Sequence, residues 1–356
     1  MARPRLVAAL LIATALGTAD FQAVSQSRTP PAQAGAAPDL ARVHLIATGG
    51  TISNRSGKRL TVDELIASLP AAGSRVRVTG EQFANVSSGA MSLAQWLDLS
   101  RRINERFRAD AGLAGVVVTS GTDTLEELAY FLHLTVRDER PVVVVGSMRT
   151  PSAVGYEGAA NLEDGVVVAA DPQARGMGAL VVLNDEIHSA REVTKTDARA
   201  LDTFRSGHYG ALGTIFDRVV FFRKPVRRHS ATSEFDVTAI SELPRVDVLL
   251  AYQGAPGDLI RAAVDHGAKG IVIAGVGTGG TSGTQGQGIA YATQQDAFVV
   301  TTTRTGSGSV GAGRRGAANR RVSGDDLQPV KARVLLMLAL ATTTDPAQVQ
   351  RMFREY

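Results

Sequence analysis

Short, continuous apolar runs alternate with helix-like stretches along most of the chain. Continuous apolar runs predict strands buried on both faces, as in a parallel sheet covered by helices. In the first half of the chain these runs are Val43–Ala47, Val116–Thr119, Val142–Val145 and Ala179–Leu183. The first half is therefore predicted to form an α/β domain with a parallel-type sheet between flanking helices.

Helix signals lie between these runs. Thr61 with Glu64, and Ser92 with Gln95, each fit a capping box, in which a hydroxyl and an acid or amide three residues later satisfy free N–H groups. After Ser92, apolar residues recur at helical spacing. Two further helices are predicted at Leu125–Val136 and Asn161–Ala170.

The polar stretch Arg227–Glu242 interrupts this rhythm and shows no clear core face, so we interpret 227–245 as a linker. A second, smaller α/β unit follows. Its predicted strands are Val246–Leu250, Gly270–Ala274 and Phe298–Thr303, and its predicted helices are Leu259–His266, Gly288–Gln294, Lys331–Ala341 and one opening at Asp345-Pro346. The pattern predicts two α/β domains, a larger one at 42–226 and a smaller one at 246–356.

The N-terminus has the pattern of a secretory signal peptide. Arg3 and Arg5 precede an apolar run from Leu6 to Leu16, and small residues follow. The run is too short to span a bilayer comfortably, and this order of residues is that of an export signal. We expect a signal peptide at 1–19, a flexible leader at 20–41, and a periplasmic or secreted protein with no membrane contact after cleavage. The alternatives are an uncleaved anchor and a misplaced start codon.

Composition narrows the function classes. The chain has 356 residues, of which 44% are hydrophobic and 20% charged, as in an ordinary globular enzyme. The net charge of +4 is small and no basic stripe is interleaved with aromatics, so we expect no nucleic-acid partner. The chain has no cysteine, and its six histidines show no metal-ligand spacing. We predict neither a metal nor a cofactor.

Two glycine turns carry the candidate chemistry. Each comes directly after an apolar strand and each holds a threonine: Gly49–Thr51 and Gly121–Asp123. The carboxyl ends of strands face the ligand crevice in an open α/β sheet, so both turns are expected around one small molecule. A threonine hydroxyl becomes a nucleophile when a neighbour takes its proton. From these residues alone, Thr51 is either such a nucleophile or an incidental residue of a strand-end turn.

Asp123 and Lys195 each allow two interpretations. Asp123 either hydrogen-bonds a ligand's amine or N-caps the following helix together with Glu126. Lys195 is an ordinary surface cation unless it reaches Thr122 and Asp123. In that case it acts either as a base or as electrostatic support, and the residues alone leave these alternatives open.

Taken together, these segments resemble the bacterial-type L-asparaginase family, specifically its exported type II branch, which includes glutaminase-asparaginases. The two threonine turns, Ala47–Ser53 and Ser120–Glu127, are similar to the two family signatures. Further similar segments, in the same order, are Val143–Arg149, Val193–Thr196, Gly275–Gly279 and Lys331–Leu336. The resemblance runs from about Val43 to Tyr356.

The resemblance implies hydrolysis of the side-chain amide of L-asparagine to L-aspartate and ammonia. It makes Thr51 the nucleophile. It makes Thr122, Asp123 and Lys195 a second catalytic group, in which Asp123 also binds the substrate α-amino group. It places Ser88 at the α-carboxylate. The full set of expected substrate-binding residues is Ser88, Gly50, Gly121, Thr122, Asp123 and Ser147. The family fold is two α/β domains assembled as a homotetramer.

This sequence departs from the family pattern in three places. The usual tyrosine on the lid after the nucleophile falls here on Leu60, and the lid looks short. A late loop that usually lends a glutamate to the neighbouring subunit is basic here, at Gly311–Gly316. Ser120 replaces a histidine, and Gly89 replaces a glutamine that helps hold substrate.

Several alternatives follow from these departures. Tyr156, Lys58 or a water could take the place of the lid tyrosine, and the sequence does not rank them. The chain could act on both asparagine and glutamine, since one methylene contributes only about 1–3 kcal/mol of discrimination. A different class is an exported, inactive homologue that binds aspartate-like ligands.

Overall fold

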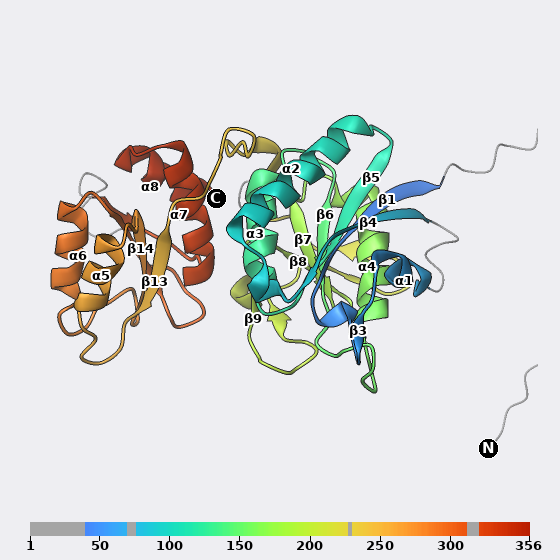
Figure 1. Cartoon of the computed structure of the whole chain (residues 1–356), viewed down its shortest axis with the longest axis horizontal. Helices are drawn as coiled ribbons and strands as arrows, with labels where there is room; N and C mark the ends of the chain where they lie inside the picture. Colours follow the sequence, from blue (N-terminus) through green and yellow to red (C-terminus); the bar gives the residue numbers. More distant parts are fainter. Residues whose placement is uncertain (1–39, 70–75, 227–229, 312–319) are drawn as a thin grey trace, which may run out of the picture. The chain divides into compact units, whose positions relative to one another are not determined.

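The computed structural model describes residues 40–69, 76–226, 230–311 and 320–356. In this part of the chain two sheets are each flanked by helices on both faces (Figure 1). The larger sheet has eight strands in the order β12-β11-β8-β7-β6-β5-β1-β4, and the smaller has four in the order β13-β14-β15-β16. The predicted fold class, a larger N-terminal and a smaller C-terminal α/β arrangement, is confirmed.

The larger sheet is parallel on one side and antiparallel on the other. Its strands are β1 (Ala41–Gly49), β4 (Val76–Val86), β5 (Leu113–Thr119), β6 (Val142–Val145), β7 (Ala179–Leu183), β8 (Glu186–Ser189), β11 (Gly213–Ile215) and β12 (Val219–Phe221). The first five are parallel, whereas β8, β11 and β12 pair antiparallel. The reversal occurs at Asn184 and Asp185, whose φ angles of 55° and 60° form a tight hairpin turn. The parallel-type prediction missed this edge.

Four helices cover the larger sheet. They are α1 (Val62–Ala67), α2 (Leu93–Ala109), α3 (Leu125–Thr135) and α4 (Gly158–Ala170). Helices α2 and α3 lie on one face, and α1 and α4 on the other (Figure 1). In β1, Ile46 packs on the first face and Leu45 on the second, because successive strand side chains point to opposite faces. Both predicted capping boxes are present, at the starts of α1 and α2.

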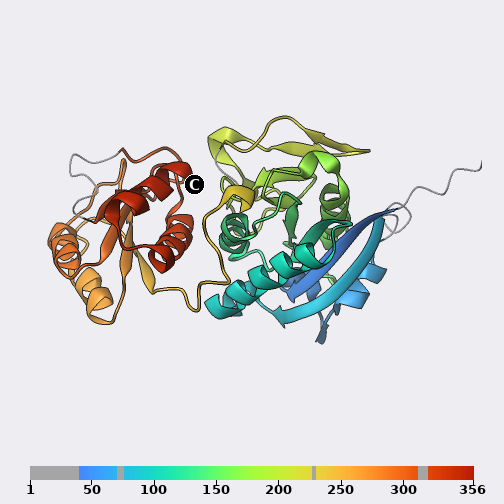
Figure 2. The ribbon, with the colours of Figure 1, turned by 90° about the horizontal axis from the view of Figure 1, so that it is seen from above.

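The smaller sheet is parallel throughout. Its strands are β13 (Val246–Leu250), β14 (Gly270–Gly275), β15 (Phe298–Thr303) and β16 (Arg321–Ser323). Its helices are α5 (Asp258–Asp265), α6 (Gln285–Gln294), α7 (Pro329–Thr342) and α8 (Pro346–Glu355). Helices α5 and α6 lie on one face of this sheet, and α7 and α8 on the other (Figure 2).

The segment between the two sheets has a core face, so that part of the linker interpretation is wrong. Residues 227–229 lie outside the described part. After the short turn η6 (Ser230–Thr232), Phe235, Val237 and Ile240 are buried in the same apolar cluster as α3 and α7. The ring of Phe235 packs against Tyr356 with centroids 5.1 Å apart. Three apolar residues separated by polar ones give no periodic signal, so the burial of this segment could not be predicted from the sequence pattern.

Two predictions fall on residues that the structure does not describe. These are the signal peptide with almost all of the leader, at 1–39, and residues 312–316 of the basic late loop, which fall in the gap at 312–319. Among the described residues, no helix is long and apolar enough to cross a bilayer.

Candidate active site

Three turns meet at the carboxyl edge of the parallel strands. β1, β4 and β5 are neighbours, and the turns after them carry Gly50, Ser88 and Gly121. A Cβ added at Gly50 would lie 2.2 Å from Gly121 N, and one added at Gly121 would lie 3.0 Å from Ser88 Oγ. Glycine is needed where main chains approach this closely, and Gly50 also has a φ of 85°. The structure thus brings together three of the predicted substrate-binding residues.

Lys195 reaches the second threonine turn. It lies on β9 (Thr194–Lys195), which pairs with β10 (Phe204–Arg205). Its Nζ donates to Thr122 Oγ1 at 3.0 Å and to Asp123 Oδ1 at 3.0 Å. The Lys195 side chain is 16% exposed and that of Asp123 82% exposed. Lys195 is therefore not an ordinary surface cation, and the Asp123 carboxylate is still open to a ligand.

The helix-capping interpretation of Asp123 is wrong. The N-cap of α3 is Thr124, and its side chain makes no capping hydrogen bond. Instead, Thr124 N donates to Ser88 Oγ at 3.3 Å. Ser88 is buried, and this hydrogen bond connects the turn after β4 to the start of α3. A helix N-terminus favours an anion through its free N–H groups and its dipole, so a carboxylate is well accommodated here.

The segment that carries Lys195 is fixed from α3 and α7. Glu126 Oε1 accepts a hydrogen bond from Lys195 N at 3.4 Å. Lys331 of α7 is fully buried and donates to the carbonyls of Arg191, at 3.0 Å, and Val193. Lys331 Nζ also lies 4.0 Å from Glu126 Oε2. Burial lowers the pKa of Lys331 to about 8, and the nearby Glu126 carboxylate opposes that shift.

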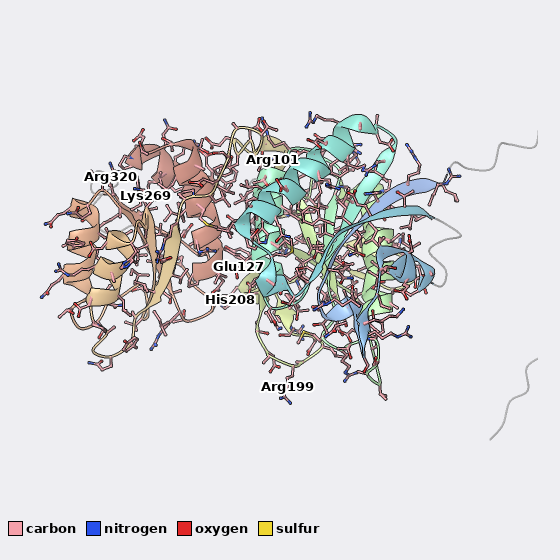
Figure 3. The ribbon with its side chains drawn as sticks, viewed as in Figure 1. Arg101, Glu127, Arg199, His208, Lys269 and Arg320 are labelled. Atoms are coloured by element: carbon pink, nitrogen blue, oxygen red, sulfur yellow. The ribbon has the colours of Figure 1, made fainter. Side chains whose placement is uncertain are left out.

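A second ion pair joins the same two helices. Glu127, the next residue of α3 (Figure 3), pairs with Arg333 of α7 at 3.8 Å. The sequence interpretation placed Glu126 only in a helix-capping pattern with Asp123, and it assigned no individual role to Lys331. A signal for Lys331 was present, because it is a lone lysine in the first turns of an otherwise largely apolar helix. No comparable signal marked Glu126, which reads as an ordinary first-turn acid.

Thr51 is held differently. It opens the 3₁₀ turn η1 (Thr51–Ser53) and is partly exposed. Among the residues that the structure describes, its hydroxyl has no hydrogen-bond partner. The main chain around it is tied, since Gly50 N donates to Val86 O at 2.8 Å and Ser53 N to Gly50 O at 3.2 Å. The Thr51 side chain is thus partly exposed on a turn whose main chain is held by hydrogen bonds.

The hairpin after Thr51 carries no tyrosine in the lid position. It consists of β2 (Asn54–Arg55) and β3 (Lys58–Arg59). Leu60, where the family has tyrosine, is buried and packs in the core below the sheet edge. Lys58 forms an ion pair with Glu64 at 2.5 Å. Of the two side chains proposed to replace the tyrosine, only Tyr156 reaches η1, with its hydroxyl 2.9 Å from Ile52 O.

The remaining predicted residues lie at the same edge with other partners. Ser147 follows β6, is fully buried, and donates to the carbonyl of Arg149. Ser120 is fully buried and donates to Gly121 O at 3.2 Å. A Cβ added at Gly89 would meet no atom within 4 Å, so the place of the family's glutamine is open. Among the described residues, no cluster of three or more His, Asp or Glu side chains is placed to hold a metal.

The comparisons with known proteins agree with this architecture. Residues 42–227 match the family described as "Asparaginase, N-terminal", and residues 245–353 match "Glutaminase/Asparaginase C-terminal domain". The chain belongs to the asparaginase family.

Similar proteins are found among curated sequences and solved structures. The chain is 43% identical to L-asparaginase 2 of Bacillus subtilis, covering 89% of this chain and 87% of that protein. It is 38% identical to the probable periplasmic L-asparaginase of Haemophilus influenzae, covering 90% and 94%. A crystal structure of a probable cytoplasmic L-asparaginase from Campylobacter jejuni superposes with a TM-score of 0.85 at 37% identity, covering 89% and 100%.

Proposed function

We propose that this protein hydrolyses the side-chain amide of L-asparagine to L-aspartate and ammonia, with Thr51 as the nucleophile. One observation carries the proposal. The Thr51 turn shares a sheet edge with a preformed Thr122–Asp123–Lys195 group, in a chain whose relatives are named L-asparaginases.

Substrate binding follows from the charges at this edge. The largely exposed Asp123 carboxylate pairs with the substrate α-ammonium group. The α-carboxylate lies against Ser88 and the N-terminus of α3, where a negative charge is stabilised. The glycines at positions 50 and 121 contribute by keeping side-chain bulk out of the contact between the turns.

The chemistry divides between the two threonines. The Thr51 oxygen attacks the carboxamide carbon, the C–N bond breaks, and the nitrogen leaves as ammonia after taking a proton. Lys195 donates to Thr122 Oγ1, so the Thr122 hydroxyl hydrogen is free to be given to that nitrogen. The proton that Thr51 loses on attack then restores the Thr122 hydroxyl, so that in net terms the Thr51 proton leaves with the ammonia. Water then hydrolyses the ester on Thr51 and releases L-aspartate.

The domain bounds, the export of the protein and its oligomeric state are part of the same proposal. We propose domains at 42–226 and 246–356 with a linker at 227–245, which the two family matches support. We also propose export with cleavage near residue 19, supported by Arg3, Arg5 and the following apolar run, and by the relative named periplasmic. A homotetramer is proposed from the family resemblance. Cell fractionation and light scattering test these two points.

The deciding experiment is ammonia release from L-asparagine and L-glutamine by the purified protein and its Thr51→Ala variant. We expect turnover that falls at least about 10³-fold in the variant, since covalent catalysis is lost. Equal turnover in both proteins would overturn the role of Thr51. Thermal stabilisation by L-aspartate without turnover in either would favour an inactive binding protein, a candidate that rests on the buried Leu60 in the lid position.

A further inference from the structure

Side chains from two separate segments donate hydrogen bonds to main-chain carbonyls on either side of Thr51. Arg59, at the end of the lid hairpin, places Nη1 3.4 Å from the carbonyl oxygen of Gly50. Tyr156, in the loop before α4, donates its hydroxyl to the carbonyl oxygen of Ile52 at 2.9 Å. Thr51 and Ile52 lie between these two carbonyls, so the peptide group directly before Thr51 and the second peptide group after it are both restrained from outside the turn.

The Tyr156 ring packs closely against the first residue of α4. A Cβ added at Gly158, the first residue of α4, would lie 2.4 Å from both the ring and the hydroxyl oxygen of Tyr156. The ring also packs against the apolar cluster that contains Ile52. The loop itself is anchored, because Glu157 Oε1 accepts hydrogen bonds from Met148 N and, at 3.3 Å, from Arg149 N. Only glycine at position 158 allows this arrangement.

The Thr51 turn needs such an external restraint. Gly49 and Gly50, which precede Thr51, have φ angles of 106° and 85° and no side chains to pack. Glycine loses more conformational freedom on folding than any other residue, so a turn entered through two glycines gains from restraints beyond the main-chain hydrogen bonds of Gly50 N and Ser53 N. A misplacement of about 1 Å at a reacting group can cost about 10²-fold in rate. A restraint on η1 therefore directly affects the position of the Thr51 hydroxyl.

We propose that Tyr156 is a positioning residue for Thr51, which it holds through the Ile52 carbonyl, and that Arg59 assists from the lid side through the Gly50 carbonyl. The inference rests on the proposed function of Thr51. It also gives Tyr156 a role different from that of the missing lid tyrosine, because the Tyr156 hydroxyl donates its hydrogen bond to a main-chain carbonyl.

The protonation of Tyr156 agrees with a donor role. Burial, with a smaller contribution from the charge of Glu157, raises the pKa of Tyr156 to about 12. The hydroxyl keeps its proton throughout the neutral range and so remains a donor. A residue in this state does not accept the proton of Thr51.

Tyr156→Phe is the direct test, since it removes the hydroxyl and keeps the ring. We expect kcat for L-asparagine to fall about 5–20-fold, the effect of one hydrogen bond lost from a reacting geometry, with KM within about twofold. The shape of the pH–rate profile is expected to stay the same. Tyr291→Phe is the matched control. It removes a tyrosine hydroxyl bonded to Asp265 in the smaller domain, and it should leave kcat unchanged.

Arg59→Leu keeps the test decisive if Tyr156→Phe does not fold. Arg59 is on the lid hairpin, and its longer contact predicts a fall in kcat of about two- to threefold with unchanged thermal stability. Unchanged kcat in folded Tyr156→Phe would overturn the proposal for Tyr156. If Tyr156→Phe does not fold, unchanged kcat in Arg59→Leu overturns it.

Two further outcomes have separate meanings. A loss of more than about 10²-fold in Tyr156→Phe, together with loss of one limb of the pH profile, would show that Tyr156 transfers a proton and would overturn the positioning role. Thr51→Ala, assayed in parallel, isolates the underlying function. If Thr51→Ala keeps its turnover, the proposed nucleophile is wrong. If it is inactive while Tyr156→Phe and Arg59→Leu are normal, only the positioning inference fails.

Discussion

The two threonine turns follow adjacent strands of one sheet, β1 and β5, and are held in place by different means. Thr122 is fixed at its side-chain oxygen, which accepts a hydrogen bond from Lys195. Thr51 is fixed through main-chain hydrogen bonds of its neighbours, and its hydroxyl has no hydrogen-bond partner in the part of the chain that the structure describes. A group that supplies a proton or a charge works best when preformed. A group that forms a covalent bond must have its bonding atom accessible to the substrate.

The supports of the two turns differ in burial as well. Behind Thr122 lies a buried network that joins α3, α7 and the segment before β9, centred on Lys331 and Glu126. Beside Thr51 lies a short hairpin with exposed residues and an external ion pair between Lys58 and Glu64. We therefore expect variants behind Thr122 to affect stability and activity together, and variants around Thr51 to affect activity alone.

Loss of Lys195 should have the largest effect on the Thr122 turn. Lys195→Met removes the cation that contacts both Thr122 and Asp123, and we expect kcat to fall about 10²–10⁴-fold. Lys195→Arg is the matched variant. It keeps the charge but should restore little activity, because a planar guanidinium does not replace a compact ammonium. Steady-state ammonia assays measure both, and near-normal kcat in Lys195→Met would remove the proposed division of labour.

Loss of Lys331 tests whether stability and activity are coupled behind Thr122. Lys331→Met leaves two carbonyls and Glu126 buried without their cation, and we expect a loss of about 3–5 kcal/mol in the free energy of unfolding. Urea unfolding followed by circular dichroism measures this loss. Lys269→Met is the control, since Lys269 is an exposed lysine next to β14 (Figure 3). Equal stability of the two variants would contradict a stabilising role for the buried contacts of Lys331.

Ser88 tests the contact between the turns. Ser88→Ala removes the acceptor of Thr124 N and a hydroxyl next to the expected carboxylate position. We expect KM for L-asparagine to rise about tenfold, and stability to fall by about 1 kcal/mol, as for a lost N-cap. Ser92→Ala, which removes the capping serine of α2, should show the stability loss without the change in KM. A change in kcat alone for Ser88→Ala would argue against substrate binding there.

The smallest predicted effects are changes of stability with pH, one near the Thr51 turn and one near the Lys195 segment. On α4, behind the Tyr156 loop, burial and then the Asp185 carboxylate raise the pKa of Asp164 to about 7. The protonated form is favoured by folding, so this contribution to stability is full below the ordinary pKa of 3.8 and is lost as pH rises through about 7. Asp164→Asn should therefore gain about 1 kcal/mol relative to the parent at pH 8–9, allowing for solvent screening.

His188, on β8 before the Lys195 segment, responds at the other end of the pH range. Burial lowers its pKa to about 4, so its contribution to stability is present above the ordinary value of 6.5 and is lost as pH falls through about 4. Thermal unfolding of the parent and Asp164→Asn between about pH 4 and 9 checks both signs. An Asp164→Asn protein with unchanged stability at alkaline pH would show that the carboxyl pair has no net effect.

Sequence patterns predicted the parts of the fold where one local rule decides. The apolar run Val142–Val145 is β6 itself, and both capping boxes open the helices expected. The antiparallel edge was missed because β11 and β12 are three residues each, too short for an alternation to register. The burial of Phe235 depends on a partner, Tyr356, that lies far away in the chain.

The candidate site divides in the same way. The convergence of the two threonine turns could be predicted, because parallel strands bring their carboxyl ends to one edge. The contact of Lys195 with Thr122 spans 73 residues, and nothing local distinguishes this lysine from a surface one. Tyr156 reaches Ile52 across 104 residues. Such contacts are set by the assembled sheet. The family resemblance alone led us to expect the contact of Lys195, and no pattern in the sequence indicated the contact between Tyr156 and Ile52.

The position of Lys331 has a consequence for biosynthesis. Both threonines, Asp123 and Lys195 are translated well before α7, yet the ammonium group that clamps the Lys195 segment enters the chain 138 residues after Val193. A nascent chain that has completed the larger sheet still lacks this clamp. The contacts that fix the Lys195 segment are therefore completed at a late stage of synthesis, when α7 docks, and a chain that ends before Lys331 would hold both threonine turns without them.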